Sequence, residues 1–149
     1  MIIRQMRRED IGQVYRIICS CLDEYYVPET LNFFIMQWSK GQLVACDTVG
    51  KIHGFLCSAM LDNGKCTISL FAVDPMNQNM GIGNDLLNEF RKTAMMHGLN
   101  AIQLEVRECN SKAIRFYEKR GFLKTGFLEH FYNDGGNAFR MISGTLIGS

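Results

Sequence analysis

The stretch from Val73 to Leu87, VDPMNQNMGIGNDLL, most restricts what this chain can fold into. A run compatible with a β-strand, Thr67 to Val73, leads into it, and an amphipathic helical pattern leaves it. Between them stand Gln78, Gly81 and Gly83. A strand, a glycine-bearing turn and a helix start together form an anion site when backbone N–H groups point at a phosphate, because a helix N-terminus carries partial positive charge. Such a spacing also arises by chance, and glycine can merely mark a turn.

The composition is that of a globular chain. With 149 residues, 47% of them hydrophobic and 21% charged, we expect a single domain over residues 1–149 with a substantial core. The formal net charge of +1 does not favour nucleic acid or a membrane surface as a partner. No apolar run approaches the roughly 20 residues of a membrane span, and the first ten residues turn charged too early for a secretory signal. We therefore expect a cytoplasmic protein.

Cysteine and histidine give no sign of a metal centre. The six cysteines form no C-x-x-C pair, and most stand in apolar neighbourhoods, so we expect reduced core thiols. His53, His97 and His130 are scattered and lack the spacing of metal ligands. We expect no metal site.

The first half of the chain predicts a strand, two helices and a hairpin. Residues Ile2 to Met6 fit a short strand, and Glu9 to Leu22 has apolar residues at helical intervals. Pro28 suits the first turn of a second helix, Glu29 to Trp38, which Gly41 ends. Two strand candidates follow, QLVACDT and KIHGFLCSAML, joined by a tight turn.

The second half alternates strands and helices. After Gly83 a helical pattern runs up to Gly98, and AIQLEV then alternates as a strand. Asn110 is a plausible N-cap for the helix SKAIRFYEKR, which ends at Gly121. A final hairpin turns near Asn133 to Gly136. The alternation of strands and helices predicts parallel strands, and the hairpins predict antiparallel strands. We therefore expect a mixed sheet with helices on both faces.

Two separated motifs resemble those of one enzyme family. Val73-Asp74-Pro75 with Gln78-x-x-Gly81-Ile82-Gly83 is similar to the acetyl-CoA loop of the GNAT N-acetyltransferases. Leu104 to Phe122, LEVRECNSKAIRFYEKRGF, resembles the second motif of that family. The resemblance covers nearly the whole chain. It implies an α/β (α+β) GNAT fold, with a mixed, mostly antiparallel sheet, a central parallel strand pair and helices on both faces.

The resemblance implies that acetyl-CoA is the cosubstrate and that the strand end, the loop, the helix start and the second motif bind it. The residues so implicated are Phe71, Ala72, Val73, Gln78, Asn79, Met80, Gly81, Ile82, Gly83, Asn84, Asn110 and Tyr117. The resemblance implies that Asn110 both caps its helix and contacts the cosubstrate.

Within the family, the second motif resembles protein N-terminal acetyltransferases of the bacterial RimI type and the archaeal NatA-like type. Tyr26-Val27-Pro28-Glu29 is similar to their substrate loop, and the tail around Tyr132 to their Tyr-Tyr-x-Asp-Gly segment. This implies protein or peptide N-termini as substrates, gripped by Val27, Pro28, Glu29 and Tyr132, with a ribosome or an auxiliary subunit as a further partner. The chain departs from the pattern at Gln78 and Gly136-Asn137, where Arg and Glu-Asp are commoner.

The transfer needs a neutral amine and a proton for the departing thiolate. The resemblance assigns these roles to Glu105, as a base acting through water, and to Tyr117, as the acid. Glu105 could equally be a solvated residue on a strand face, and Tyr117 could be core packing. Cys109 has no histidine partner in sequence, so direct transfer in a ternary complex is preferred to a thiol intermediate.

Three alternative functions stay open. A small amine or a lysine side chain could be the acceptor. A non-catalytic acetyl-CoA-binding subunit is a third candidate, although such a protein has no need of Glu105 or Tyr117. The peptide-gripping loops argue against the small amine.

Overall fold

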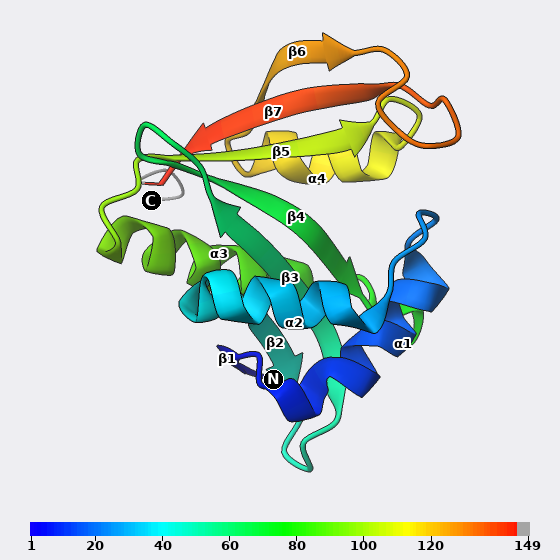
Figure 1. The fold of residues 1–149 in the computed structure, drawn as a ribbon, viewed down its shortest axis with the longest axis vertical. Coiled ribbons are helices and arrows are strands. Elements are labelled where there is room, and N and C mark those ends of the chain that lie inside the picture. Colours follow the sequence, from blue (N-terminus) through cyan, green and yellow to red (C-terminus); the bar gives the residue numbers. More distant parts are fainter. Residues whose placement is uncertain (146–149) are drawn as a thin grey trace.

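The computed structural model describes residues 1–145. They contain one seven-stranded sheet in the order β1-β2-β3-β4-β5-β7-β6 (Figure 1). Only β4 (Lys65–Val73) and β5 (Ala101–Arg107) pair in parallel, and all other neighbours are antiparallel. The mixed, mostly antiparallel sheet with a central parallel pair is therefore confirmed. The remaining strands are β1 (Ile2–Gln5), β2 (Leu43–Cys46), β3 (Ile52–Met60), β6 (Leu123–Leu128) and β7 (Ala138–Gly144).

Helices cover both faces of the sheet, as expected. In Figure 1, α1 (Ile11–Cys21) and α2 (Pro28–Gln37) lie in front of it, and α3 (Ile82–Met96) lies behind. The helix α4 (Ser111–Lys119) packs on the same side as α3. Strand residues alternate between the two resulting cores, one under α1 and α2 and one under α3 and α4. No helix of residues 1–145 has the length and apolar character needed to cross a membrane.

Two helix boundaries differ from the sequence prediction. The first helix begins at Ile11, because a 3₁₀ turn, Arg8–Asp10, precedes it. The second ends at Gln37, and Gly41 does not terminate it. Trp38 instead leaves the helical backbone and buries its side chain, and Ser39–Gly41 forms a separate 3₁₀ turn. Burial of this indole ends the helix earlier than the glycine would.

An extra residue in β4 changes which side chains face which core. Cys57 of β3 pairs with Leu70 of β4, but Ser58 pairs with Ile68, so Ser69 has no partner on β3. A one-residue bulge reverses the face to which all later side chains point. Ile68 accordingly packs in the core under α3 and α4, and Leu70 in the core under α1 and α2.

Directly after the bulge, the two parallel strands part. Lys65–Ile68 pairs with Ala101–Leu104, and no pairing between β4 and β5 follows in the described residues. β4 stays paired with β3 as far as Val73, and β5 stays paired with β7 as far as Arg107. The facing edges of the two strands are therefore held apart by their outer partners, which leaves a gap within the sheet.

A buried glutamine secures β3 next to the bulge. Gln42 is fully buried, and its amide nitrogen donates to the carbonyl oxygens of Trp38 and Ser58, each at 2.8 Å. Its Oε1 accepts from the Ser58 backbone N–H at 2.8 Å. The side chain thus satisfies both backbone groups of Ser58 where the antiparallel pairing is irregular.

We expect Gln42→Leu to lower the free energy of unfolding by about 2–4 kcal/mol, because it removes the hydrogen bonds of the Gln42 amide to the buried Ser58 N–H and C=O groups. Urea denaturation followed by circular dichroism measures this loss. Gln37→Leu, on the exposed end of α2, is the matched control and should change stability by less than about 0.5 kcal/mol. A similar small effect for both variants would contradict the role given to Gln42.

Candidate active site

The glycine loop lies at the end of β4, where the strands part. Its first residues form a 3₁₀ turn, Pro75–Asn77, and the Asp74 carboxylate caps this turn by accepting from the Met76 N–H at 3.1 Å. Gly81 has φ +82°, a left-handed conformation that strains other residues. Gln78 crosses the loop and donates its amide to the Val73 carbonyl at 3.1 Å. The loop is therefore braced by its own side chains.

Backbone N–H groups at the start of α3 are available to a ligand. The first hydrogen bond of this helix joins the Asp85 N–H to the Gly81 carbonyl at 3.0 Å, so the three preceding amides have no partner within the helix. A Cβ added at Gly81 would meet no atom within 4 Å, which leaves open space beside these amides. Asp85 is exposed, so its carboxylate does not fill that space. The geometry fits a phosphate-bearing group.

A cavity of about 500 Å³ lies between this loop and α4. It brings together all the residues predicted to bind the cosubstrate except Met80, whose side chain is exposed and does not line it. Part of the wall was not predicted from the sequence: α4 and its C-cap contribute most of it at helical spacing, and Asn77 comes from the loop. The missed residues are Asn77, Lys112, Ala113, Phe116 and Arg120.

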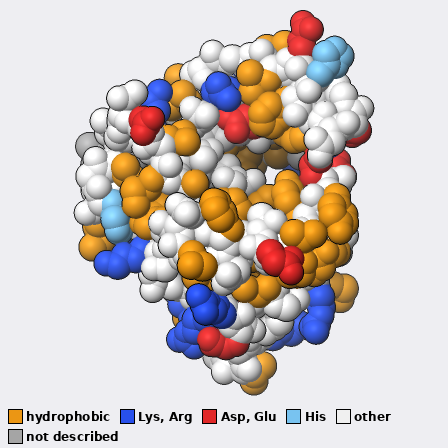
Figure 2. Space-filling view, viewed as in Figure 1, with side chains coloured by type: hydrophobic (Ala, Val, Ile, Leu, Met, Phe, Trp, Pro, Cys, Tyr) orange, Lys and Arg blue, Asp and Glu red, His pale blue; other side chains and the backbone are white. Residues whose placement is uncertain are grey.

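A second cavity, of about 420 Å³, occupies the gap on the side of α1 and α2. Figure 2 shows this face hollowed where β4 and β5 part in Figure 1. Glu105, Tyr117 and Tyr132 line it, but Val27, Pro28 and Glu29 do not. Those three residues form the start of α2, and the preceding loop, with Asp23, Glu24 and Tyr26, lines the cavity instead.

The two cavities share one short wall. Phe71, Asn110, Ala113 and Tyr117 line both of them. Asn110 caps α4 as predicted, because its Oδ1 accepts from the Ala113 N–H at 3.1 Å. This cap fixes the first turn of α4 against the gap.

Tyr117 is the polar side chain of that wall that can donate a proton. Its ring packs edge-on against Phe116 and Phe122 and at a tilt against Phe71, with centroids 5.3–6.4 Å apart. Burial raises the pKa of Tyr117, with a smaller contribution from Tyr132, so the phenol stays protonated at neutral pH. Packing and proton donation are compatible here, because the aromatic ring is enclosed while the residue lines both cavities.

Glu105 projects from the face of β5 that looks toward α1 and α2. Its Oε2 accepts from Arg140 Nε at 3.0 Å and from Gln103 Nε2 at 3.1 Å. Arg140 stands directly opposite on β7, which makes this a cross-strand ion pair. The carboxylate is therefore held in place, and neither of these two contacts uses its Oε1.

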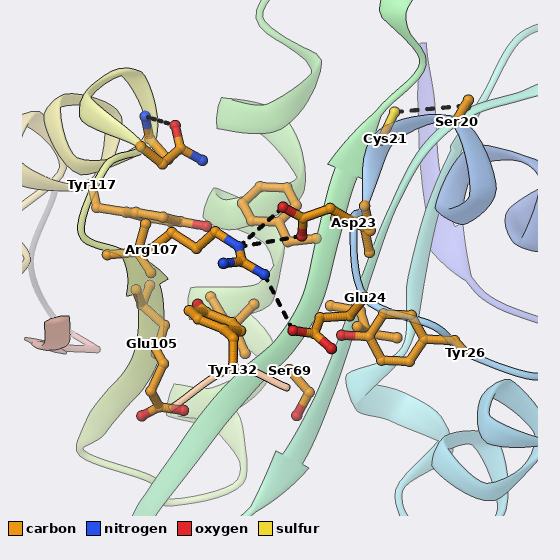
Figure 3. A pocket seen from close by; sticks show the side chains of 18 residues that line it. Ser20, Cys21, Asp23, Glu24, Tyr26, Ser69, Glu105, Arg107, Tyr117 and Tyr132 are labelled. Carbon is orange, nitrogen blue, oxygen red and sulfur yellow. Dashed lines mark hydrogen bonds and ion pairs between the residues drawn. The ribbon is translucent and has the colours of Figure 1, made fainter. Parts of the chain in front are cut away.

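Arg107 organises the polar side of the second cavity (Figure 3). It lies two residues after Glu105 and thus on the same strand face. Its Nε lies 3.0 Å from Asp23 Oδ2, and its Nη2 lies 3.2 Å from Glu24 Oε1. The guanidinium also stacks over the Tyr132 ring, 4.0 Å from the centroid. Strand alternation alone could have identified Arg107 as a lining residue.

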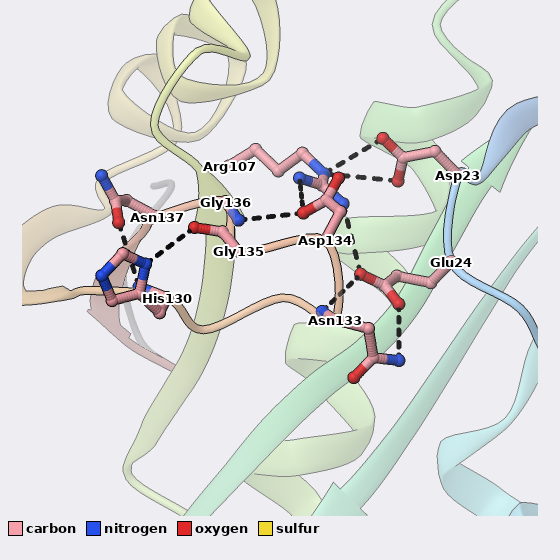
Figure 4. Close-up of polar contacts among 9 residues, drawn as sticks. All are labelled: Asp23, Glu24, Arg107, His130, Asn133, Asp134, Gly135, Gly136 and Asn137. Atoms are coloured by element: carbon pink, nitrogen blue, oxygen red, sulfur yellow. Dashed lines mark hydrogen bonds and ion pairs between the residues drawn. The ribbon is translucent and has the colours of Figure 1, made fainter.

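The same arginine reaches the loop between β6 and β7 (Figure 4). Its Nη1 lies 3.2 Å from Asp134 Oδ1. Asn133 adds two hydrogen bonds to Glu24, from its backbone N–H at 3.3 Å and its Nδ2 at 3.0 Å. A Cβ added at Gly136 would stand 2.5 Å from Arg107 Nη1, so glycine at this position leaves room for the guanidinium. Two loops far apart in sequence are thereby joined.

Cys109, which has no histidine partner in sequence, lies outside both cavities. It is exposed, and the thiols of Cys57 and Cys66 are buried. Cys21 lines the second cavity, where its Sγ contacts the Val73 carbonyl oxygen at 3.4 Å. Residues 1–145 contain no group of three or more His, Cys, Asp or Glu side chains that could hold a metal ion.

Comparisons with known proteins agree with this geometry. The model of the acetyltransferase (GNAT) family matches residues 11–122. An N-alpha-acetyltransferase of Sulfurisphaera tokodaii is 31% identical over 93% of this chain and 90% of its own length. The crystal structure of Ard1 from Thermoplasma volcanium is 34% identical, with a TM-score of 0.94 over 97% of both chains. A NatC complex bound to Gag peptide and CoA has the same fold, with a TM-score of 0.89 at 22% identity over 96% of this chain and 97% of its own. On this evidence, the chain belongs to the GNAT family of acetyltransferases, which use acetyl-CoA.

Proposed function

We propose that this protein transfers the acetyl group of acetyl-CoA to the N-terminal α-amine of proteins or peptides. The observation that carries the proposal is the pair of cavities on opposite faces of the sheet, which meet at a wall containing Tyr117. One cavity ends at an amide cradle suited to phosphates, and the other is bounded by two loops and a cluster of charged side chains. Such a layout lets the acyl donor and the amine approach each other from opposite sides, as direct transfer requires.

The names of similar proteins support the α-amine as acceptor. The relative from Sulfurisphaera tokodaii is an N-alpha-acetyltransferase, and so is a 27% identical protein of Schizosaccharomyces pombe. The similar NatC structure contains both a peptide and CoA. The similar NatB and NatC structures are of complexes, which supports an auxiliary subunit as a partner of this chain. A ribosomal partner and a cytoplasmic location also stay predictions.

On the donor side, the loop and α3 are suited to orient the cosubstrate. When bound, acetyl-CoA supplies a thioester and a thiolate leaving group. The free amides of Ile82, Gly83 and Asn84 would hold phosphate oxygens, and the parted edge of β4 offers unpaired backbone groups to the arm that leads to the thioester.

Tyr117 is the residue we assign as the general acid. The raised pKa of Tyr117 keeps its hydroxyl protonated. Tyr117 also belongs to the wall that the two cavities share, so it lies where the acyl donor and the amine would meet. Donation of its proton to the departing sulfur would avoid release of a free thiolate.

Glu105 is the residue we assign as the base, acting through a water molecule. An α-amine has a pKa of about 7.7–8.0 against about 10.4 for lysine, so a weak base suffices for the α-amine. The contacts with Arg140 and Gln103 orient the carboxylate and leave Oε1 to accept from water.

Tyr26 and Tyr132 suit a peptide more than a small amine. They come from the two loops on either side of the second cavity and present aromatic surface there. Burial raises the pKa of Tyr132 to about 12, so its hydroxyl is a donor at neutral pH. Aromatic rings with hydroxyl groups can hold a peptide backbone without selecting one side chain.

The acceptor is tested with two peptides of the same composition. We expect a peptide with a free N-terminus to be acetylated there, and an N-blocked peptide with an internal lysine to react at least ~10-fold more slowly, a barrier difference of about 1.4 kcal/mol. Mass spectrometry locates the acetyl group in each. Equal or faster reaction at lysine would overturn the N-terminal assignment.

Gly81→Glu tests the phosphate cradle. The new side chain would enter the open space beside the α3 amides and bring a like charge, so we expect the Kd for acetyl-CoA to rise at least ~10-fold. Gly81→Ala imposes the same backbone strain without blocking the cradle and is the matched control in calorimetric titration. If both variants bind acetyl-CoA equally well, the cradle is not at this loop.

Tyr117→Phe tests proton donation. The variant keeps the packed ring and removes the hydroxyl, so we expect kcat to fall by roughly 10- to 10³-fold with little change in melting temperature. Tyr25→Phe, at an exposed position outside both cavities, should leave kcat unchanged. Turnover of Tyr117→Phe close to that of the control would require another acid.

A further inference from the structure

The phosphate side of the first cavity obtains its positive charge from α4. Among residues 1–145, the lining of this cavity includes two cations, Lys112 and Arg120, and no carboxylate. The loop from Asp74 to Gly83 contains neither Lys nor Arg. Gln78, at the position where the family more often has arginine, turns its amide to the Val73 carbonyl. A ligand with several phosphate groups therefore meets neutral amides on the loop and cationic side chains on the facing helix.

These two cations lie on one stripe of α4. Lys112, Phe116 and Arg120 follow each other at intervals of four residues, which places them on the same helix face. The stripe faces the start of α3, because a Cβ added at Gly83 would lie 3.5 Å from the Phe116 ring. The cationic stripe and the free amides of α3 thus border the same space.

Arg120 is held in a defined orientation at the end of this stripe. Its Nε donates to Asn84 Oδ1 at 2.8 Å, and its Nη1 donates to the Phe116 carbonyl at 2.9 Å. The guanidinium stacks on the Phe116 ring, 3.7 Å from the centroid. Nη2 has no hydrogen bond to any part of the chain that the structure describes. Asn84 belongs to the first turn of α3, so the contact anchors the guanidinium beside the unpaired amides.

We propose that Arg120 is a phosphate-binding residue of the acetyl-CoA site, with Nη2 donating to a phosphate oxygen. Its positive charge attracts the phosphate groups in place of a cation on the glycine loop. An arginine already fixed by two hydrogen bonds and a stacked ring loses little side-chain freedom when a ligand binds. The proposal rests on the use of acetyl-CoA and is independent of which amine is acetylated.

Calorimetric titration of the full chain with CoA tests the contact. Arg120→Met keeps an unbranched apolar side chain over Phe116 and removes the charge, and we expect its Kd for CoA to be at least ~10-fold higher than that of the unaltered protein. Lys119→Met is the matched control, because Lys119 is the neighbouring exposed cation and does not line the cavity. Its Kd should stay within about twofold. Arg120→Lys, which retains the charge, should recover part of the lost affinity.

Two further ligands show what the arginine contacts. Pantetheine lacks phosphate, so Arg120→Met and the unaltered protein should bind it equally in a competition assay. If 3′-dephospho-CoA still shows the loss, Arg120 binds the pyrophosphate; if the loss disappears, it binds the 3′-phosphate, and both results support the proposal. Equal CoA binding by Arg120→Met and Lys119→Met would overturn it, and so would an equal loss for pantetheine. Failure of the unaltered protein to bind CoA would instead remove the cosubstrate from this cavity, and the proposal with it.

Discussion

The parting of β4 and β5 is the constraint on which the site depends. β4 is paired with β3 as far as Val73, apart from the bulge at Ser69, and β5 is paired with β7 as far as Arg107, so the inner edges stay apart beyond Ile68 and Leu104. Exposed backbone groups along these edges require partners, which a ligand or water can supply. The gap also lets Tyr117 on α4 reach a cavity that otherwise belongs to the side of α1 and α2.

The bulge at Ser69 and the parting of the strands act together. Without the extra residue, Phe71 and Val73 would point toward α1 and α2, and the strand end would present different side chains to the cosubstrate. With it, both residues pack against the core under α3 and α4 and line the first cavity. One inserted residue thus determines which side chains the end of β4 presents to the first cavity.

The features that the sequence predicted correctly are local ones. Gly81 was identified because few residues tolerate a positive φ, and Asn110 because an N-cap needs a short acceptor side chain. The hairpin turn near Asn133 to Gly136 is equally clear in the sequence, and Gly135 within it has a positive φ. The alternation of strands and helices predicted the mixed sheet, and the family motifs predicted its central parallel pair.

The features that sequence reasoning missed depend on contacts between distant segments. The bulge at Ser69 is set by pairing with β3, and nothing in TISLFAV marks the extra residue. Arg107 gains its role from Asp23 and Asp134, which stand 84 and 27 residues away. Substrate residues were placed at the start of α2 because the family motif lies there, whereas the fold turns the preceding loop toward the cavity.

The placement of the two cavities on opposite faces of the sheet has a kinetic consequence. Neither ligand has to cross the other's cavity to reach the shared wall at Phe71, Asn110, Ala113 and Tyr117. With each ligand in its own cavity, neither binding event blocks the other, so initial-rate lines at varied donor and acceptor concentrations should intersect, as in any sequential mechanism. The same separation lets CoA and the acetylated product dissociate independently, so each should inhibit chiefly by competing with its own precursor.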